Sequence, residues 1–352
     1  MSTILRSRLS CIARRQFLRT SLASRSLRLK ARSYATGSAK ESPLNTHSQP
    51  KTAVQPSYGP VGVAAALQAS PNDPPPTPTL LTREFSLSSR VALITGANSG
   101  LGLEASLALL EAGARAVYCV DLPKEPGEEW EAVRRYAGRL ALAREGGRGT
   151  GEGRMEYVCA DVRDQEGMWK VGEMIGEREG RLDVCVAAAG VPHVADCLDI
   201  PAAQFSKVMD VNTNGVLYTA QAAGQQMARF GNGGSIILMA SIAGSVTLQG
   251  VASIAYNTSK SAVLQMARSM ACELGPRNIR VNSLSPGWMY TNMVTPVLAA
   301  EPKLEGMLAG QNPLGRMGRA DELRGVVVWL ASDASSFCTG SDIVVSGGHH
   351  AW

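Results

Sequence analysis

The 352-residue sequence predicts an α/β fold over residues 83–352, a doubly wound parallel sheet in a single domain. Short runs of Val, Ile, Leu and Ala alternate there with segments of helical periodicity. These runs are apolar throughout, which is typical of parallel strands that helices cover on both faces. A glycine-rich turn joins the first run to the first helical segment, as the doubly wound arrangement requires.

The elements follow one another as strand and helix along the chain. We expect strands at 90–95, 116–120, 155–160, 182–187, 235–239, 280–283 and 342–345. We expect helices at 101–112, 127–144, 165–179, 201–230, 255–274 and 320–331. A second glycine-rich stretch, 146–153, precedes a strand instead of opening a helix, so we interpret it as a surface excursion rather than a phosphate loop.

The N-terminal residues differ in composition from the predicted domain. Residues 1–34 are rich in Arg and Ser, contain no acidic residue and place leucines at helical spacing, which predicts a mitochondrial transit peptide and import into the matrix. A basic disordered tail is the alternative. Residues 35–82 hold half of the 18 prolines, so we predict a disordered linker there.

Composition argues against several other functions. Residues 1–40 carry ten of the 35 basic residues and no acid, so 25 basic residues remain against 30 acidic ones and give no basis for nucleic-acid binding. No apolar run is long enough to insert in a membrane. The seven cysteines and four histidines show no metal-ligand spacing, so we expect no metal site.

The turn after the first predicted strand has the features of a dinucleotide-binding site. Its glycines permit a tight turn, close approach of a pyrophosphate and close packing of helix on sheet, while the helix N-terminus faces the phosphates. This order of strand, turn and helix is the signature of a Rossmann fold. The predicted cofactor-binding residues here are Gly96, Asn98, Ser99, Gly100, Leu101 and Gly102.

The second predicted strand ends at an acidic residue, Asp121. A carboxylate at this position accepts hydrogen bonds from the ribose hydroxyls of NAD and repels the 2′-phosphate of NADP. No basic residue occupies the turn at 98–99 to bind that phosphate. The sequence therefore favours NAD, with NADP as the alternative.

Tyr256 and Lys260 lie four residues apart, and Ser241 precedes them. On a helix, residues at this spacing share one face, so the lysine ammonium would lie beside the tyrosine phenol. A free tyrosine has a pKa of about 10, and a fixed positive charge stabilises its phenolate. The pair therefore predicts a tyrosine that transfers protons.

Together these motifs resemble the short-chain dehydrogenase/reductase family over residues 86–352. The resemblance implies that Ser241 polarises a carbonyl, Tyr256 is the general acid/base, Lys260 binds the nicotinamide ribose and lowers the pKa of Tyr256, and Asn212 holds a water of the proton relay. It also implies a homotetramer. Further cofactor-binding residues that it implies are Asp161, which meets the adenine amino group, Val162, Gly190, Pro286, Gly287, Met289 and Thr291, besides Tyr256 and Lys260.

One motif departs from the family. An asparagine usually stands where this chain has Ala188, in Ala187-Ala-Ala-Gly190, so we expect weakened cofactor affinity or stability. Substrate contacts are expected from 190–198, 242–255 and the region after Thr291, where 290–311 would form a mobile lid. His193 and Trp352 are weaker candidates for the pocket.

The motifs 234–241, 267–273, 285–288 and 347–352 are most similar to the branch of the family that acts on polyols and ketoses, such as D-arabinitol 2-dehydrogenase, sorbose reductase and mannitol dehydrogenase. We therefore expect an oxidoreductase that interconverts a secondary alcohol and a ketone, with a polyol or ketose substrate. A mitochondrial 3-oxoacyl thioester reductase is a second possibility. A non-catalytic NAD-binding regulatory protein is a third.

Overall fold

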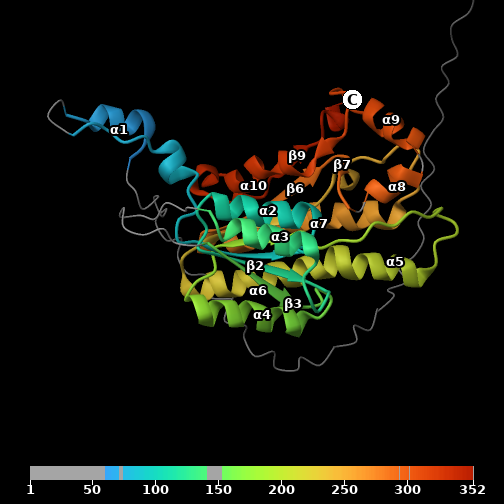
Figure 1. The fold of residues 1–352 in the computed structure, drawn as a ribbon, viewed down its shortest axis with the longest axis horizontal. Coiled ribbons are helices and arrows are strands. Elements are labelled where there is room, and N and C mark those ends of the chain that lie inside the picture. The colour runs from blue at the N-terminus through green and yellow to red at the C-terminus, as the bar shows by residue number, and fades with distance from the viewer. Residues whose placement is uncertain (1–59, 71–73, 141–152, 293, 301, 352) are drawn as a thin grey trace, which may run out of the picture. The chain divides into compact units, whose positions relative to one another are not determined.

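The computed structural model describes residues 60–70, 74–140 and 153–351, except 293 and 301. Seven parallel strands form one sheet in the order β3-β2-β1-β4-β5-β6-β9 (Figure 1). This arrangement confirms the predicted doubly wound fold. The strands are β1 (Val91–Thr95), β2 (Ala116–Asp121), β3 (Arg154–Cys159), β4 (Val184–Ala187), β5 (Gly234–Met239), β6 (Ile279–Pro286) and β9 (Asp342–Val345).

The strand order reverses direction beside β1, which pairs with β2 on one side and β4 on the other. Thr95, at the carboxyl end of β1, is in register with Val120 and with Ala187. Ligands of doubly wound sheets bind at such a switch point, outside the carboxyl ends of the strands. The fold therefore directs attention to the loops that leave β1, β2, β4 and β5.

Helices pack on both faces of the sheet and bury two apolar cores (Figure 1). One face is covered by α4 (Gln165–Glu179), α6 (Gly215–Phe230) and α7 (Ile254–Leu274). The other is covered by α2 (Gly100–Glu111), α3 (Glu128–Ala137) and α10 (Arg324–Ala331). Burial on both faces explains why the central strands are apolar throughout.

Helix ends show why the sequence predicted some bounds well. The Asp164 side chain accepts a hydrogen bond from the Gly167 amide and begins α4, and Gly180 ends it with a left-handed φ of 70°. An Asp N-cap and a Gly after the last turn are strong end signals. The prediction for 165–179 is confirmed to the residue.

The predicted long helix 201–230 contains a break in its hydrogen-bond pattern. It consists of α5 (Ala202–Met209), a π-helical turn η2 (Asp210–Asn214) and α6. Similarly, 320–331 begins with the 3₁₀ turn η5 (Ala320–Leu323) before α10. The helix expected over 127–144 spans Glu128–Ala137 in the structure. Residues 141–152 lie outside the described part.

Smaller elements complete the described chain. They are α1 (Gly62–Gln68), the π turn η1 (Leu80–Glu84), the 3₁₀ turns η3 (Ile242–Gly244), η4 (Gly275–Arg277), η6 (Asp333–Ser335) and η7 (His349–Ala351), the short pair β7 (Met289–Tyr290) and β8 (Gly318–Arg319), and the helices α8 (Thr295–Ala300) and α9 (Pro302–Gly310). Thus α1 lies within the predicted linker, η1 begins in it and ends two residues beyond it, and α8 and α9 lie within the predicted lid.

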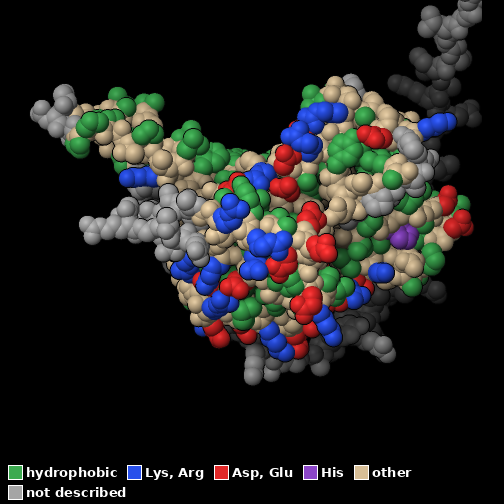
Figure 2. Space-filling model, in the orientation of Figure 1, with side chains coloured by type: hydrophobic (Ala, Val, Ile, Leu, Met, Phe, Trp, Pro, Cys, Tyr) green, Lys and Arg blue, Asp and Glu red, His purple; other side chains and the backbone are tan. Residues whose placement is uncertain are grey.

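Several predictions fall wholly or partly outside the described residues. The transit peptide 1–34, most of the linker, most of the glycine-rich stretch 146–153 and Trp352 belong to this group, and they stay predictions. Within the described part, no helix combines the length and the apolar character needed to cross a membrane. On the face drawn in Figure 2, basic and acidic side chains are intermingled.

Candidate active site

The turn between β1 and α2 packs tightly against the loop after β4. A Cβ atom added at Gly96 would lie 2.7 Å from the Ala189 backbone, and Gly96 has a φ of 67°. A Cβ added at Gly102 would lie 2.2 Å from the Gly96 carbonyl oxygen. Both positions therefore require glycine. At Gly96 a side chain would be strained by the positive φ and would clash with Ala189, whereas at Gly102 it would only clash with Gly96.

In the described part of the chain, no side chain caps the N-terminus of α2. The N-cap residue, Ser99, makes no capping hydrogen bond through its side chain. A Cβ added at Gly100 would meet only Thr291 Cβ, at 4.0 Å. Exposed amides at a helix N-terminus bind phosphate groups, so this turn fits the pyrophosphate of a dinucleotide.

Asp121 and Asn98 connect this turn to the loops after β2. The Asp121 carboxylate accepts hydrogen bonds from the backbone amides of Asn98, at 2.9 Å, and Leu122, at 2.8 Å. The Asn98 side-chain oxygen accepts one from the Gly127 amide at 2.8 Å. Asp121 thus lies at the edge of the turn, where the sequence predicted an acid that meets the ribose, and it also orders the turn.

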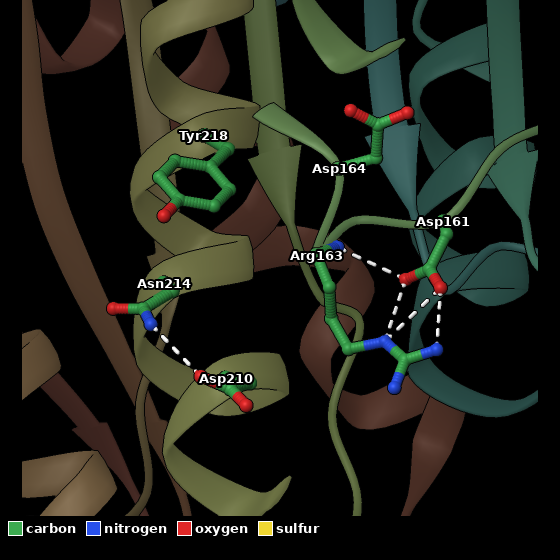
Figure 3. A pocket seen from close by; sticks show the side chains of 6 residues that line it. All are labelled: Asp161, Arg163, Asp164, Asp210, Asn214 and Tyr218. Atoms are coloured by element: carbon green, nitrogen blue, oxygen red, sulfur yellow. Dashed lines mark hydrogen bonds and ion pairs between the residues drawn. The ribbon is translucent and has the colours of Figure 1, made fainter. Parts of the chain in front are cut away.

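Asp161, the predicted partner of adenine, is bound by a neighbouring arginine (Figure 3). The Arg163 guanidinium contacts both of its carboxylate oxygens, at 2.5 to 3.0 Å, and these hydrogen bonds lower the pKa of Asp161. A cavity of about 420 Å³ opens beside them, lined also by Asp164, Asp210, Asn214 and Tyr218. The next predicted residue, Val162, is buried and packs against Gly215.

Tyr256 and Ser241 lie together at the carboxyl side of β5. Tyr256 is on the first turn of α7 and packs against the apolar cluster of Ile242, Ala243 and Leu248. Burial raises the pKa of the Tyr256 phenol, and a hydrogen bond with Ser241 partly opposes this rise. The Ser241 hydroxyl also accepts a hydrogen bond from the Ala243 amide at 3.2 Å.

Lys260 is buried one turn further along α7. Its Nζ donates to the Met239 carbonyl oxygen at 2.8 Å and lies 5.6 Å from the centroid of the Tyr256 ring. Burial lowers the pKa of Lys260 from 10.5 to about 8. The ammonium therefore lies over the Tyr256 ring. The predicted lowering of the Tyr256 pKa by Lys260 stays a prediction.

This buried ammonium makes folding stability depend on pH. In the unfolded chain Lys260 keeps its proton up to about pH 10.5, whereas in the folded chain Lys260 loses its proton above about pH 8. Between these two pH values the unfolded state binds more protons than the folded state. The free energy of unfolding therefore rises with pH in this range. At about 1.4 kcal/mol per pH unit, we expect wild type to gain about 3 kcal/mol relative to Lys260→Met between pH 8 and 10.5. Urea unfolding of both proteins at several pH values measures this difference. Parallel pH dependences would contradict it.

Comparison with the Lys260→Met variant removes the contribution of other buried groups. Burial raises the pKa of the Cys119 and Cys185 thiols, to about 11 and about 12, which makes stability fall above about pH 9. Both proteins contain these thiols, so the difference between them reports Lys260.

Asn212 lies at the centre of the π-helical turn η2 and is fully buried. Its side-chain oxygen accepts from the Val191 amide at 2.8 Å, and its Nδ2 donates to the Val191 carbonyl at 3.0 Å and to Ser259 Oγ at 3.2 Å. A Cβ added at Gly190 would lie 3.4 Å from Asn212 Oδ1 and 3.7 Å from Lys260 Nζ. Asn212 thus fixes the loop after β4 beside Lys260.

The two loops predicted to contact substrate pair with each other. The Ala195 amide donates to the Ala252 carbonyl at 2.9 Å, and Ala195 forms a bridge with Ser253. The apolar cluster around Tyr256 includes Val246 and Val251 from the second loop and Trp288 from the loop after β6. His193 lies half-buried on the first loop. Substrate specificity is therefore expected to depend on three loops around Tyr256.

The segment after β6 forms the remaining side of the site. Pro286 ends β6, the Gly287 amide donates to the Val345 carbonyl at 2.9 Å, and Met289 is buried. In the predicted lid, Leu298 of α8 and Leu308 of α9 pack with Met317 and Trp288. Met307 of α9, by contrast, is exposed. The mobility of the lid stays a prediction.

Sequence reasoning missed the backbone partners that hold the site together. Val191, Met239 and Ser259 anchor Asn212 and Lys260, but two of them act through backbone groups, which no residue type reveals. Ala188, which stands where the family usually has an asparagine, packs against the apolar core on the α2 side of the sheet. In the part of the chain that the structure describes, no group of three His, Cys, Asp or Glu residues could hold a metal ion.

Comparisons with known proteins agree with this geometry. A family model described as enoyl-(acyl carrier protein) reductase matches residues 96–350. A short-chain dehydrogenase/reductase of Aspergillus versicolor is 34% identical over 85% of this chain and 99% of its own length. Sorbose reductase of Schizosaccharomyces pombe is 35% identical over 76% and 99%, and D-arabinitol 2-dehydrogenase of Candida tropicalis is 32% identical over 76% and 95%.

Solved structures show the same fold. A short-chain type dehydrogenase/reductase from Mycobacterium marinum superposes with a TM-score of 0.68 at 35% identity, covering 76% of this chain and 98% of that one. A gluconate 5-dehydrogenase from Burkholderia cenocepacia, in complex with NADP and tartrate, superposes with a TM-score of 0.66 at 29% identity, covering 78% and 99%.

Proposed function

Since the chain belongs to the short-chain dehydrogenase/reductase family, we propose that it interconverts a secondary alcohol and a ketone, with a polyol or ketose as substrate. The observation that carries the proposal is the assembly of Ser241, Tyr256, Lys260 and Asn212 around one point beside the switch point of the sheet. Proton transfer from a carbinol needs such a set on one rigid frame.

The residues of the β1–α2 turn fit a nicotinamide dinucleotide. The space above Gly100 and the uncapped amides of α2 would hold the pyrophosphate, and Asp121 would accept from the adenosine ribose. When bound, the nicotinamide ring of the cofactor would accept or donate the hydride. All remaining chemistry belongs to side chains of this protein.

In alcohol oxidation, the Tyr256 phenolate takes the proton from the substrate hydroxyl, and in ketone reduction the phenol returns it. The Ser241 hydroxyl donates to the substrate oxygen, where negative charge develops. Burial alone raises the pKa of Tyr256, so positive charge is needed to make the phenolate accessible near neutral pH. Lys260 supplies that charge from within 5.6 Å of the ring centroid.

We propose NAD as the preferred cofactor because Asp121 ends β2. The Asp121→Asn substitution removes the charge that repels a 2′-phosphate, so we expect the ratio of kcat/KM for NADP to kcat/KM for NAD to rise by about tenfold. Initial rates with both cofactors measure the ratio. Asp333→Asn is the matched control, because Asp333 pairs with Arg90 at 2.6 Å, before the start of β1 and away from the carboxyl ends of the strands. An unchanged ratio would show that Asp121 does not select the cofactor.

The substrate class rests on two observations. Sorbose reductase and D-arabinitol 2-dehydrogenase are among the relatives that this chain matches over nearly their whole length. The cluster around Tyr256 also contains a polar group: the indole Nε1 of Trp288 is buried without a hydrogen-bond partner among the described residues. Such a group favours a ligand that brings hydroxyls.

Acetoacetyl thioesters form the alternative substrate class. The matching family model is described as a reductase of another acyl thioester, the enoyl group on acyl carrier protein. A panel of pentitols, hexitols, ketoses and acetoacetyl thioesters, assayed with NAD(H) and NADP(H), distinguishes the two. We expect the highest kcat/KM with a polyol–ketose pair. Higher activity with a thioester would overturn the substrate proposal, and cofactor binding without turnover of any alcohol or ketone would overturn the enzymatic one.

A further inference from the structure

The loops predicted to hold the cofactor come from both halves of the sheet, and we call the surface between them the cofactor groove. On one side lie the β1–α2 turn and the start of α3, which the Asn98–Gly127 hydrogen bond holds together at 2.8 Å. On the other side lies the segment after β6. Its Thr291 lies close to Gly100, because a Cβ atom built on Gly100 would lie 4.0 Å from Thr291 Cβ. The N-terminus of α2, the expected pyrophosphate site, therefore lies between them.

One side-chain hydrogen bond connects these two sides. Asn292 Nδ2 donates to Glu129 Oε2 at 2.9 Å, although the two residues are 163 positions apart in the sequence. Glu129 is in the first turn of α3, and Asn292 directly follows Thr291. The bond thus connects the adenosine half of the groove with the half that leads to Tyr256.

Local structure does not require either side chain. The turn after Thr291 is held by its own carbonyl oxygen, which accepts from the amides of Val294 and Thr295 and from the Thr295 hydroxyl. The first turn of α3 begins at Gly127 without any side-chain cap. Both Asn292 and Glu129 are exposed, so their contact contributes little to the core.

We propose that Asn292 and Glu129 form a clasp across the cofactor groove, and that this clasp slows release of the bound dinucleotide. A dinucleotide whose pyrophosphate lies at the N-terminus of α2 can leave only when the segment carrying Thr291 and Asn292 moves away from α3. Breaking the hydrogen bond makes that movement easier. Both residues are therefore positioning residues, since they act through the segment that covers the cofactor.

The charge of Glu129 makes the proposal sharply testable. A carboxylate near the groove repels the phosphates of the cofactor, so electrostatics alone predicts that Glu129→Ala slows release. The clasp predicts the opposite sign. Glu129→Gln separates the two effects further, because the amide oxygen still accepts from Asn292 while the charge is gone.

The experiment is stopped-flow displacement of reduced cofactor, NADH or NADPH, whichever binds more tightly in an equilibrium fluorescence titration. We expect release to be about 3- to 10-fold faster in Asn292→Ala and in Glu129→Ala, and no faster in the double variant than in the faster single one. Glu129→Gln should stay within about twofold of wild type. The matched control is Glu128→Ala, an exposed acid of the same helical turn, which should release cofactor no faster than wild type.

The same data define failure. Release from Glu129→Ala that is unchanged or slower, release from Asn292→Ala that is unchanged, or additive effects in the double variant would each overturn the clasp. Thermal unfolding without cofactor should not differ among these variants, because both residues are exposed. The assay follows cofactor dissociation only, so it stands independently of which alcohol the enzyme oxidises.

Discussion

Tyr256→Phe is expected to lower kcat by a factor of about 10² to 10⁴ or more while cofactor affinity stays near wild type. The phenyl ring keeps its packing against Ile242, Ala243 and Leu248, so the pocket retains its shape. Only the hydroxyl that we propose as the proton donor and acceptor for the substrate is lost. Steady-state kinetics with the best substrate of the panel, together with a fluorescence titration of reduced cofactor, measure the two quantities separately.

Tyr136→Phe is the matched control for this substitution. Tyr136 is 53% exposed on α3 and is remote from the groups that assemble around Ser241, so its kcat should equal that of wild type. Near-normal turnover by Tyr256→Phe would exclude Tyr256 as the acid/base. Loss of cofactor binding in that variant would instead indicate that the phenol has a binding role.

Gly102→Ala is expected to weaken cofactor binding by about tenfold or more and to destabilise the fold by about 1–3 kcal/mol. The new methyl group would lie 2.2 Å from the Gly96 carbonyl oxygen, a backbone atom that cannot move without opening the β1–α2 turn. Opening that turn also displaces the amides at the N-terminus of α2. Titration with reduced cofactor and chemical denaturation measure the two effects.

Gly180→Ala separates loss of stability from loss of the cofactor site. Gly180 has a φ of 70° and open space around its Cα, so alanine there costs about 1–2 kcal/mol through backbone conformation alone. It ends α4, away from the β1–α2 turn. Its cofactor affinity should therefore match wild type, and equal weakening in both variants would show that Gly102 acts only through global stability.

The sequence predicted the doubly wound fold because its signals are local. Apolar runs, the Gly96–Gly102 turn, the cap at Asp164 and the glycine at 180 each report a nearby backbone geometry. The carboxyl ends of parallel strands then bring distant motifs to one edge. Asn98, Asp121 and Ser241 accordingly lie at that edge, while their roles toward cofactor and substrate stay predictions.

What the sequence could not provide depends on contacts between distant backbone atoms. The π turn at Asn212 follows from its bonds to Val191 and Ser259, and no propensity distinguishes such a turn from regular helix. The position of Lys260 Nζ is set by the Met239 carbonyl, and Asp161 is bound by Arg163. These tertiary contacts determine the electrostatics of the site, so pKa directions required the structure.

The pairing of Ala195 with Ser253 has an evolutionary implication for substrate preference. A substitution that reshapes the loop after β4 also displaces the loop after β5, because their backbones are hydrogen-bonded. Changes in the two loops are therefore expected to be epistatic: a replacement that improves use of a new substrate in one background is expected to be harmful in another. Directed evolution of this enzyme should accordingly randomise both loops together, since libraries confined to one of them sample mostly incompatible combinations.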